Sequence, residues 1–461
     1  MDIRPLFVAY ACKPGHGSEP GVGWNFVAEA ARHRPVWVIT HEENRAKIEA
    51  HLAACDPRPA VFFRYVKLPR PLRRLEAGGY VGFNVAYYLW NVLAGRQAVR
   101  WHEEVGFTLV QHVSLVRWWM PTAAARLASR GVRFVWGPVG AGEGITPGLE
   151  RKLAWRHRAM ERARRWVRAA FRADPRLAAT ARAADLALAG TREVEKHLRR
   201  LGVKRVELMP AVAIEAGRLP LRAGGESAGT SGPEAGRPFI FCSGGGLIYW
   251  KRIDLALRAF AALNLPDAEY HHVCGGQEQP RLEALARELG IADRVSFLGE
   301  MDYRQCCEHM ARVDVLVHPA LRDSCGLILE AFGSGVPVIA FDVGTAGLLV
   351  DETCGATIPT AGATEADLLA ALTENMRIAY ADAGLRATWA AGAAARSGVC
   401  SREERGRRLE AIWAELHAPA SREQGAQADG RAYSLRPMQR EEARHGEPRC
   451  GEASAMTRTV A

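Results

Sequence analysis

Short apolar runs alternate with polar, glycine-containing loops along the middle of the chain. Residues 314–318 are rich in β-branched side chains, residues 319–326 carry proline, glycine and small polar side chains, residues 327–332 favour a helix, and residues 337–341 are apolar again. This order predicts a strand, a loop, a helix and a second strand, which together form one unit of a parallel α/β sheet. Ligands bind such sheets at the loops that follow the carboxyl ends of the strands.

Similar units occur on both sides of this stretch. Strands are predicted at residues 6–10, 36–40, 61–66, 107–112, 134–136, 186–189 and 206–209, and then at residues 239–243, 271–274 and 295–298. Residues 216–237 lie between the two series, are rich in glycine, serine and proline, and lack apolar periodicity, which indicates a linker or a surface insertion.

The two series predict two α/β domains. We expect an N-terminal domain over residues 1–215 and a C-terminal domain over residues 238–400. A helix over residues 401–418 should pack back towards the N-terminal domain. Residues 419–461 have few large apolar groups and are expected to be disordered.

Residues 149–172 predict a basic amphipathic helix. Trp155, Ala159, Ala163, Trp166 and Ala170 recur at intervals of three and four residues, and arginines fill the opposite face. The plainer interpretation is a surface helix whose charged side is solvated. The functional interpretation is a face that holds the protein at an anionic membrane surface, near lipid-linked or phosphate-bearing acceptors.

Composition and charge narrow the class of protein. With 48% hydrophobic and 24% charged residues, the sequence is that of a globular protein with enough apolar material for sizeable cores. The net charge of +10 and the pI near 9.2 favour an anionic partner, which would be a phosphorylated small molecule, an acidic membrane surface or nucleic acid. No nucleic-acid recognition module accompanies the charge, so nucleic acid is not the expected partner.

Targeting and cysteine patterns favour a cytoplasmic protein. The apolar stretch at residues 81–93 is shorter than the roughly 18 residues that a membrane span needs. Residues 1–15 lack the basic start and long apolar core of a signal peptide. The ten cysteines have no zinc-type spacing and indicate reduced, mostly buried thiols. If the helix at 149–172 binds lipid, the protein would be peripheral on the inner face of the plasma membrane.

A glycine-rich loop at residues 11–24 follows the first predicted strand, and a helix is expected to follow the loop. A dinucleotide-binding G-x-G-x-x-G fingerprint would have its third glycine where Pro20 stands, and its turn is tighter than this loop. Four glycines with Ser18 and Glu19 between them indicate instead a loop that faces a ligand.

The loop at residues 319–326 has groups suited to a sugar phosphate. The backbone N–H groups of Ser324 and Gly326 lie at the start of the predicted helix, where they can bind a phosphate. Asp323 and Glu330 supply carboxylates that can accept hydrogen bonds from sugar hydroxyl groups. An anion at a helix start gains only about 0.3–1 kcal/mol, so the loop needs a further group from elsewhere in the chain.

Four segments together resemble the retaining glycosyltransferases of family 4, which have the GT-B fold of two Rossmann-like domains facing a central cleft. GSEPGVGW at residues 17–24 and FVWGPVGAGE at residues 134–143 resemble loops of one branch of that family. YWKR at residues 249–252 resembles the donor-site lysine segment, and DSCGLILEAFGSGVPVIA at residues 323–340 resembles the donor-site acidic motif. Their order and spacing extend the resemblance over residues 3–416.

The resemblance implies a nucleoside diphosphate sugar in the C-terminal domain and an acceptor on the N-terminal domain. Lys251 would neutralise the leaving diphosphate, Glu330 would bind the donor ribose, and Asp323 would contact the sugar. Gly17 would let the backbone approach a phosphate or the acceptor. The other implied donor positions are Gly245, Gly246, Arg252, Gly275, Gly276, Leu298, Ser324, Cys325, Gly326 and Leu327, and the opposite wall would include Gly17, Ser18, Glu19 and Gly140. The reaction would need no metal or other cofactor.

The sequence departs from the family pattern at three points. The family has an acid, seven residues and then the glutamate, but Arg322 stands in the first position before Glu330. Gly246 stands where an arginine usually precedes the lysine, and Arg252 is the candidate substitute. The usual N-domain histidine is missing from the second motif; His112 is the nearest candidate, and a structural role for this histidine is an equal alternative.

These patterns predict an enzyme that transfers a hexosyl or related sugar to a saccharide or lipid-linked acceptor with retention of configuration, in the synthesis of a cell-surface polysaccharide or glycolipid. Two alternatives stay open. One is a catalytically weak protein that binds sugar nucleotides, as the three departures suggest. The other is a nucleotide-dependent oxidoreductase, which would need the fingerprint that Pro20 interrupts.

Overall fold

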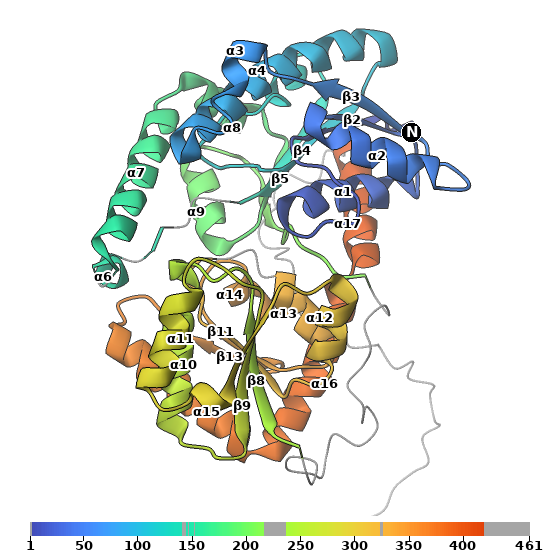
Figure 1. Cartoon of the computed structure of the whole chain (residues 1–461). Coiled ribbons are helices and arrows are strands. Elements are labelled where there is room, and N and C mark those ends of the chain that lie inside the picture. Colours follow the sequence, from blue (N-terminus) through green and yellow to red (C-terminus); the bar gives the residue numbers. More distant parts are fainter. Residues whose placement is uncertain are drawn as a thin grey trace, which may run out of the picture.

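The computed structural model describes residues 2–140, 144–145, 147–151, 153–215, 237–322 and 326–418 of the chain. Two parallel β-sheets, each covered by helices, lie one above the other in Figure 1. Each sheet has buried apolar clusters that hold its helices. The predicted fold class of two Rossmann-like α/β domains is confirmed.

The N-terminal sheet has seven parallel strands in the order β3-β2-β1-β4-β5-β6-β7. The strands are β1 (Pro5–Ala9), β2 (Val36–His41), β3 (Val61–Val66), β4 (Leu109–Ser114), β5 (Arg133–Val139), β6 (Leu186–Ala189) and β7 (Val206–Leu208). The helices are α1 (Ser18–Ala31), α2 (Arg45–Ala53), α3 (Arg70–Arg73), α4 (Gly79–Val105), α5 (Ala125–Ala128), α6 (Pro147–Glu150), α7 (Trp155–Arg172), α8 (Pro175–Ala183) and α9 (Arg192–Arg200). All seven strands predicted for this half are present, with ends that differ by a few residues.

The C-terminal sheet has six parallel strands in the order β10-β9-β8-β11-β12-β13. The strands are β8 (Phe239–Gly244), β9 (Ala268–Val273), β10 (Val295–Gly299), β11 (Val315–His318), β12 (Val338–Phe341) and β13 (Gly355–Ile358). The helices are α10 (Ile253–Leu263), α11 (Gln279–Glu288), α12 (Tyr303–Met310), α13 (Gly326–Gly333), α14 (Ala346–Leu349), α15 (Glu365–Ala381), α16 (Ala383–Val399) and α17 (Arg402–His417). The stretch at 314–341 thus forms β11, α13 and β12.

Helix α1 starts earlier than the sequence pattern predicts. A loop was expected up to residue 24, but the helix begins at Ser18. A Cβ atom on Gly21 would lie 1.9 Å from the carbonyl oxygen of His16, and one on Gly23 would lie 2.0 Å from another carbonyl oxygen of the loop. These two glycines therefore let the helix pack closely on the preceding loop, so their role is steric rather than that of a ligand-facing turn.

The apolar stretch at residues 81–93 lies within α4, a helix of 27 residues. Trp90, Ala94 and Ala98 are fully buried in the core of the N-terminal domain. Of the helices in the described part of the chain, none combines the length and the apolar character needed to cross a membrane.

Helix α17 follows the C-terminal domain in sequence but packs on the N-terminal domain. Trp413 is fully buried, and its Nε1–H donates to Oε1 of Gln111 at 3.1 Å. Arg405 and Glu29 form a buried ion pair, with 2.6 Å between Nη2 and Oε1. The chain beside this helix also forms a parallel bridge between Ile214 and Ser401, so the two connections between the domains run side by side.

The segment between β5 and α7 enters the other domain. Ile145 and Leu149 are buried in an apolar cluster of the C-terminal domain, although they precede residue 215 in sequence. The chain then returns along α7, which lies at the side of the molecule in Figure 1. The single helix predicted over 149–172 is wrong in one respect, because α6 ends at Glu150 and α7 begins only at Trp155.

Candidate functional site

Two glycine-containing loops meet where β8 and β9 end. The N–H of Leu247 donates to the carbonyl oxygen of Gly275 at 2.9 Å, and the N–H of Glu278 donates to that of Leu247 at 3.1 Å. A Cβ atom on Gly276 would lie 2.5 Å from the backbone nitrogen of Leu247, so a larger residue would separate the loops. The structure thus brings together four of the predicted donor residues: Gly245, Gly246, Gly275 and Gly276.

Lys251 reaches the first of these loops from the short helix η2 (Tyr249–Lys251). Its side chain is largely buried, with 8% of the residue exposed. A Cβ atom on Gly245 would lie 2.9 Å from Nζ of Lys251, and Gly245 also has a φ of +91°, which favours glycine. Gly245 is therefore required both by the turn and by the ammonium group beside it.

Glu330 lies on α13 and is half-buried. Burial raises the pKa of its carboxyl group to about 7, although a long contact from Cys306, with 3.9 Å between Sγ and Oε2, acts to lower it. Leu327, on the same helix, packs so closely on β8 that a Cβ atom on Gly244 would lie 2.7 Å from its Cδ2. Leu327 and Leu298 border the same apolar cluster, so they lie with the predicted donor residues.

Two buried histidines lie near Lys251. Burial, followed by the charge of Lys251, lowers the pKa of His318 at the end of β11. Burial also lowers the pKa of His272 to about 4, against the effect of its contact with the carbonyl oxygen of Gly245. Both imidazoles are therefore neutral at neutral pH. Burial raises the pKa of Cys274, and the charges of both Lys251 and Glu330 also act on it, so these two side chains lie in the same region of the domain.

Arg252 is engaged elsewhere. Its guanidinium group pairs with Asp254, with 3.0 Å between Nε and Oδ1, and with Glu365, with 2.8 Å between Nη2 and Oε2. These contacts join α10 to α15 and leave Arg252 only 4% exposed. The suggestion that Arg252 replaces the family's donor arginine stays a prediction, and the geometry favours a structural role.

A buried carboxylate on α7 contacts the C-terminal domain close to Lys251. Glu161 accepts hydrogen bonds from Tyr249 at 2.5 Å, from Arg322 at 2.7 Å and from Arg164 at 2.7 Å. Burial acts to raise the pKa of Glu161, but the hydrogen bond and charge of Arg322, with Tyr249 and Arg164, hold the pKa below its usual value. Arg322, which stands where the family resemblance implies an acid, is therefore paired with an acid of α7.

The residues predicted to form the wall opposite the donor site lie near the ends of β1, β4 and β5. Glu19, on the first turn of α1, accepts the N–H of Leu115 at 2.9 Å. The N–H of Gly140 donates to the carbonyl oxygen of Val116 at 2.9 Å. Of the predicted wall residues, Gly17, Ser18 and Glu19 lie at the start of α1 and Gly140 follows β5, and Glu19 and Gly140 both bond to the turn after β4. Burial raises the pKa of Glu19, while Leu115 and the charge of Arg117 act to lower it.

His112 lies beneath this wall and is 2% exposed. Its Nε2 contacts the hydroxyl group of Tyr87 at 3.1 Å, and its Nδ1 contacts that of Thr122 at 2.6 Å. Burial lowers its pKa to about 3, so the imidazole is neutral. Because both ring nitrogens have partners, the geometry favours the structural alternative for His112, and its catalytic role stays a prediction.

Three predicted residues, Asp323, Ser324 and Cys325, lie outside the described residues. Two residues near the candidate site, Arg117 and Glu161, were not predicted from the sequence. Arg117 is 8% exposed and lies over the rings of Phe83, Tyr87 and Trp119 at 5.1–5.5 Å. Glu161 could have been noticed, because it is the single acid in the sequence from Trp155 to Arg172.

The arrangement suits a ligand with both phosphate and hydroxyl groups. Lys251 supplies an amine beside the two glycine loops, and the start of α13 supplies backbone N–H groups. Glu330 supplies an acceptor for a hydroxyl group. Within the described residues there is no group of three or more acidic, histidine or cysteine side chains that could hold a metal ion. The expectation that the chemistry needs no metal stays a prediction.

The match to a known protein family falls in the C-terminal domain. Residues 230–383 match the sequence model of the family described as glycosyl transferases group 1, and they include Lys251 and Glu330. The lipopolysaccharide glucosyltransferase WaaG of Escherichia coli (strain K12) is 34% identical over 149 residues, which cover 31% of this chain and 37% of WaaG. The D-inositol 3-phosphate glycosyltransferase of Geodermatophilus obscurus is 41% identical over 106 residues, which cover 20% of this chain and 24% of that protein. The matched stretches thus span well under half of each relative.

Solved structures extend the similarity to the whole fold. The crystal structure of WaaG aligns with a TM-score of 0.54 at 18% identity, covering 88% of this chain and 99% of WaaG. Anabaena HepE in complex with UDP aligns with a TM-score of 0.56 at 16% identity, covering 90% of this chain and 100% of HepE. Both are GT-B glycosyltransferases, and the fold of this chain is GT-B.

The raised pKa of Glu330 predicts a pH-dependent effect of Glu330→Gln on stability. Between pH 4.5 and 7 the unfolded chain loses this proton while the folded chain keeps it, so the wild type loses stability as pH rises. The neutral glutamine avoids this loss. We expect Glu330→Gln to match the wild type near pH 5 and to exceed it by on the order of 1–3 kcal/mol at pH 8, as measured by urea unfolding.

The matched control is Glu288→Gln, because Glu288 is an exposed acid at the end of α11. Its difference from the wild type should not change between the two pH values. A Glu330→Gln effect that is the same at pH 5 and pH 8 would contradict the burial of an acid at this position.

Proposed function

We propose that this chain is a glycosyltransferase that moves a sugar from a nucleoside diphosphate donor to a saccharide or lipid-linked acceptor. The observation that carries the proposal is the meeting of Lys251, Glu330 and two glycine loops at the carboxyl ends of the C-terminal strands, within the segment that matches the group 1 family. The complexes of HepE with UDP and with UDP-glucose support a nucleotide donor for this fold.

Each group has a role that its surroundings support. The departing diphosphate builds up negative charge, and Lys251 can offset it from its place beside Gly245, whose lack of a side chain makes room for the ammonium group. The N–H groups at Gly326 and Leu327 add dipoles of the same sign. Glu330 binds the hydroxyl groups of the ribose, as the family resemblance implies. Retention of configuration and a hexosyl donor rest on that resemblance.

The acceptor binds on the N-terminal domain, opposite the donor residues. Gly17 and Glu19, at the start of α1, and Gly140, after β5, lie at the carboxyl edge of the N-terminal sheet, where ligands bind in parallel sheets. The similarity to WaaG and to an inositol phosphate glycosyltransferase supports an acceptor that is a saccharide or carries a phosphate. Synthesis of a cell-surface polysaccharide or glycolipid is the corresponding role.

One observation favours the alternative of a protein that binds sugar nucleotides without rapid turnover. Arg322 stands in place of the family's first acid and is paired with Glu161. If that acid is needed for chemistry, binding would persist while transfer is slow. Assays of binding and of transfer on the same preparation separate the two functions.

Lys251→Ala and Glu330→Ala should each slow sugar transfer by about 10²–10³-fold without unfolding the protein, because each removes a group that acts on the donor. The donor is first chosen by thermal shift among UDP, GDP and ADP sugars, since a ligand of the folded state raises its apparent stability. Release of the nucleoside diphosphate then measures the rate. Lys204→Ala, at an exposed lysine of the N-terminal domain, is the control. Near-normal rates for both active-site variants would refute the site.

A peripheral membrane location is proposed from the orientation of α7. Trp155 and Trp166 are 75% and 72% exposed, whereas the charged Glu161, Arg164 and Arg168 face the protein. Arg158 and Arg162 are exposed as well, so the outward side of this helix carries both aromatic and basic side chains, which suits an anionic membrane surface. Eleven residues separate the tryptophans, or about 16 Å along the helix, so both can enter one lipid interface.

The double variant Trp155→Ser/Trp166→Ser should reduce sedimentation with phosphatidylglycerol vesicles at least tenfold, because two interfacial aromatic side chains are lost. Phe62→Ser removes another exposed aromatic side chain, from β3, and serves as the control. Variants of the exposed Arg158 and Arg162 should weaken binding further at low salt. Equal pelleting of the wild type and the tryptophan variant would rule out this face.

A further inference from the structure

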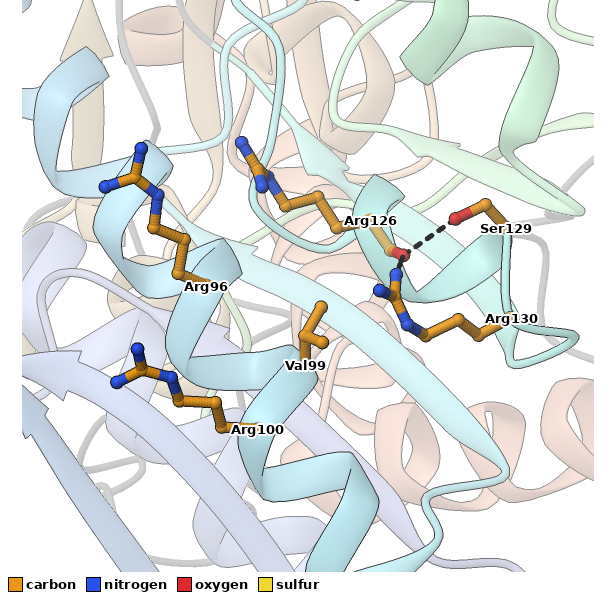
Figure 2. Close-up of a pocket in the computed structure, with 6 residues that line it drawn as sticks. All are labelled: Arg96, Val99, Arg100, Arg126, Ser129 and Arg130. Atoms are coloured by element: carbon orange, nitrogen blue, oxygen red, sulfur yellow. Dashed lines mark hydrogen bonds between the residues drawn. The ribbon is translucent and has the colours of Figure 1, made fainter.

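Four arginines surround an open pocket on the N-terminal domain. Arg96 and Arg100 come from α4, and Arg126 and Arg130 come from α5 and the turn after it; Val99 and Ser129 complete the lining (Figure 2). The pocket has a volume of about 470 Å³. Within the described part of the chain, none of these four guanidinium groups forms a salt bridge with a carboxylate.

An apolar groove of about 620 Å³ adjoins this pocket and shares Arg126 and Ser129 with it. The walls of the groove are formed by α4, α5 and α8. Its apolar lining includes Val92, Pro121, Ala123, Ala125, Ala128, Ala179 and Ala183. A strongly basic pocket and an apolar groove thus form one continuous depression.

The sequence of α4 produces this continuity. Tyr88, Val92, Arg96 and Arg100 recur every four residues, so they lie along one ridge of the helix. The first two line the groove and the last two line the basic pocket. Twelve residues of helix span about 18 Å, which is the length of a headgroup with part of an alkyl chain.

The position of Arg126 depends on a glycine in α4. A Cβ atom on Gly95 would lie 2.6 Å from Cδ of Arg126, so the side chain lies directly against the helix backbone. The carbonyl oxygen of Arg126 accepts hydrogen bonds from Arg130 and from Ser129, both at 3.0 Å (Figure 2). These contacts keep two of the four cations at the junction of pocket and groove.

We propose that this depression binds an anionic amphiphile, with a phosphate group held by the four arginines and an alkyl chain in the groove. Arginine matches phosphate through paired N–H donors, and the cluster lacks acids that would offset its charge. The adjoining apolar walls favour an alkyl chain over a free anion. The occupant is a single lipid phosphate molecule, which distinguishes this site from the outward face of α7.

The site is separate from the proposed sugar-transfer site. Arg96 and Arg100 lie in the half of α4 that leads into β4, and Arg130 lies just before β5. The arginines therefore gather near the amino ends of the strands, whereas the candidate site lies at the carboxyl ends. Binding of the amphiphile can be measured without any transfer reaction, so either proposal can fail alone.

The test uses hexyl, octyl and decyl phosphate below their micellar concentrations, in calorimetric titrations of the full chain. Each added methylene group should tighten binding by up to about fourfold while the groove has room. Inorganic phosphate and octyl glucoside should each bind at least tenfold more weakly than octyl phosphate. Arg96→Gln/Arg100→Gln should weaken binding of octyl phosphate at least tenfold. Ala179→Glu should abolish the dependence on chain length.

Two variants serve as controls. Arg258→Gln/Arg287→Gln removes two exposed arginines from α10 and α11 and should bind octyl phosphate as the wild type does. Lys251→Ala should also bind normally, which excludes capture at the donor site. Thermal unfolding confirms that each variant is folded.

Three results would overturn the proposal. Unchanged binding by Arg96→Gln/Arg100→Gln would show that the arginines do not hold the phosphate. Equal affinity for inorganic phosphate and decyl phosphate would show a free-anion site. Chain-length dependence that persists in Ala179→Glu would place the alkyl chain elsewhere.

Discussion

A buried carboxylate, with the apolar Val167 and Phe171, fixes which side of helix α7 faces the protein. Glu161 must face the protein, because only there does it meet Tyr249, Arg322 and Arg164. Leaving such a charge without its partners would cost about 3–5 kcal/mol. With 3.6 residues per turn, this requirement turns the opposite side of the helix, with Trp155, towards solvent. The same contact joins the N-terminal half of the chain to the segment that precedes α13.

The helices and loops that carry the proposed donor site, the outward face of α7 and the arginine pocket contact one another. Glu161 binds Tyr249, which lies in the same short helix as the lysine of the proposed donor site, and Arg322, which lies over the ring of Trp250, the residue between Tyr249 and that lysine. Helix α7 contacts α8, α8 contacts α5, and α5 contacts α4, which completes the path to the arginine pocket. The proposed lipid-phosphate site and the outward face of α7 are thus linked through helices in direct contact.

The architecture could be predicted from the sequence more completely than the side-chain contacts could. Apolar runs bounded by glycine located the strands of both sheets, because burial on both faces requires such runs. The local sequence pattern did not predict features that depend on packing between segments far apart in the sequence. The glycines after Gly17 permit close packing of α1, which cannot be distinguished from a ligand loop by composition. Likewise, Arg252 meets Glu365, and Glu161 meets Arg322, across more than 110 residues of sequence.

The most direct test of the proposed function is a crystal structure with the nucleoside diphosphate that gives the largest thermal shift. We predict that its diphosphate lies within hydrogen-bonding distance of Nζ of Lys251 and that a ribose hydroxyl group contacts the carboxyl group of Glu330. A nucleotide bound instead to the loop before α1, with Lys251 and Glu330 free of ligand, would contradict the proposed donor site.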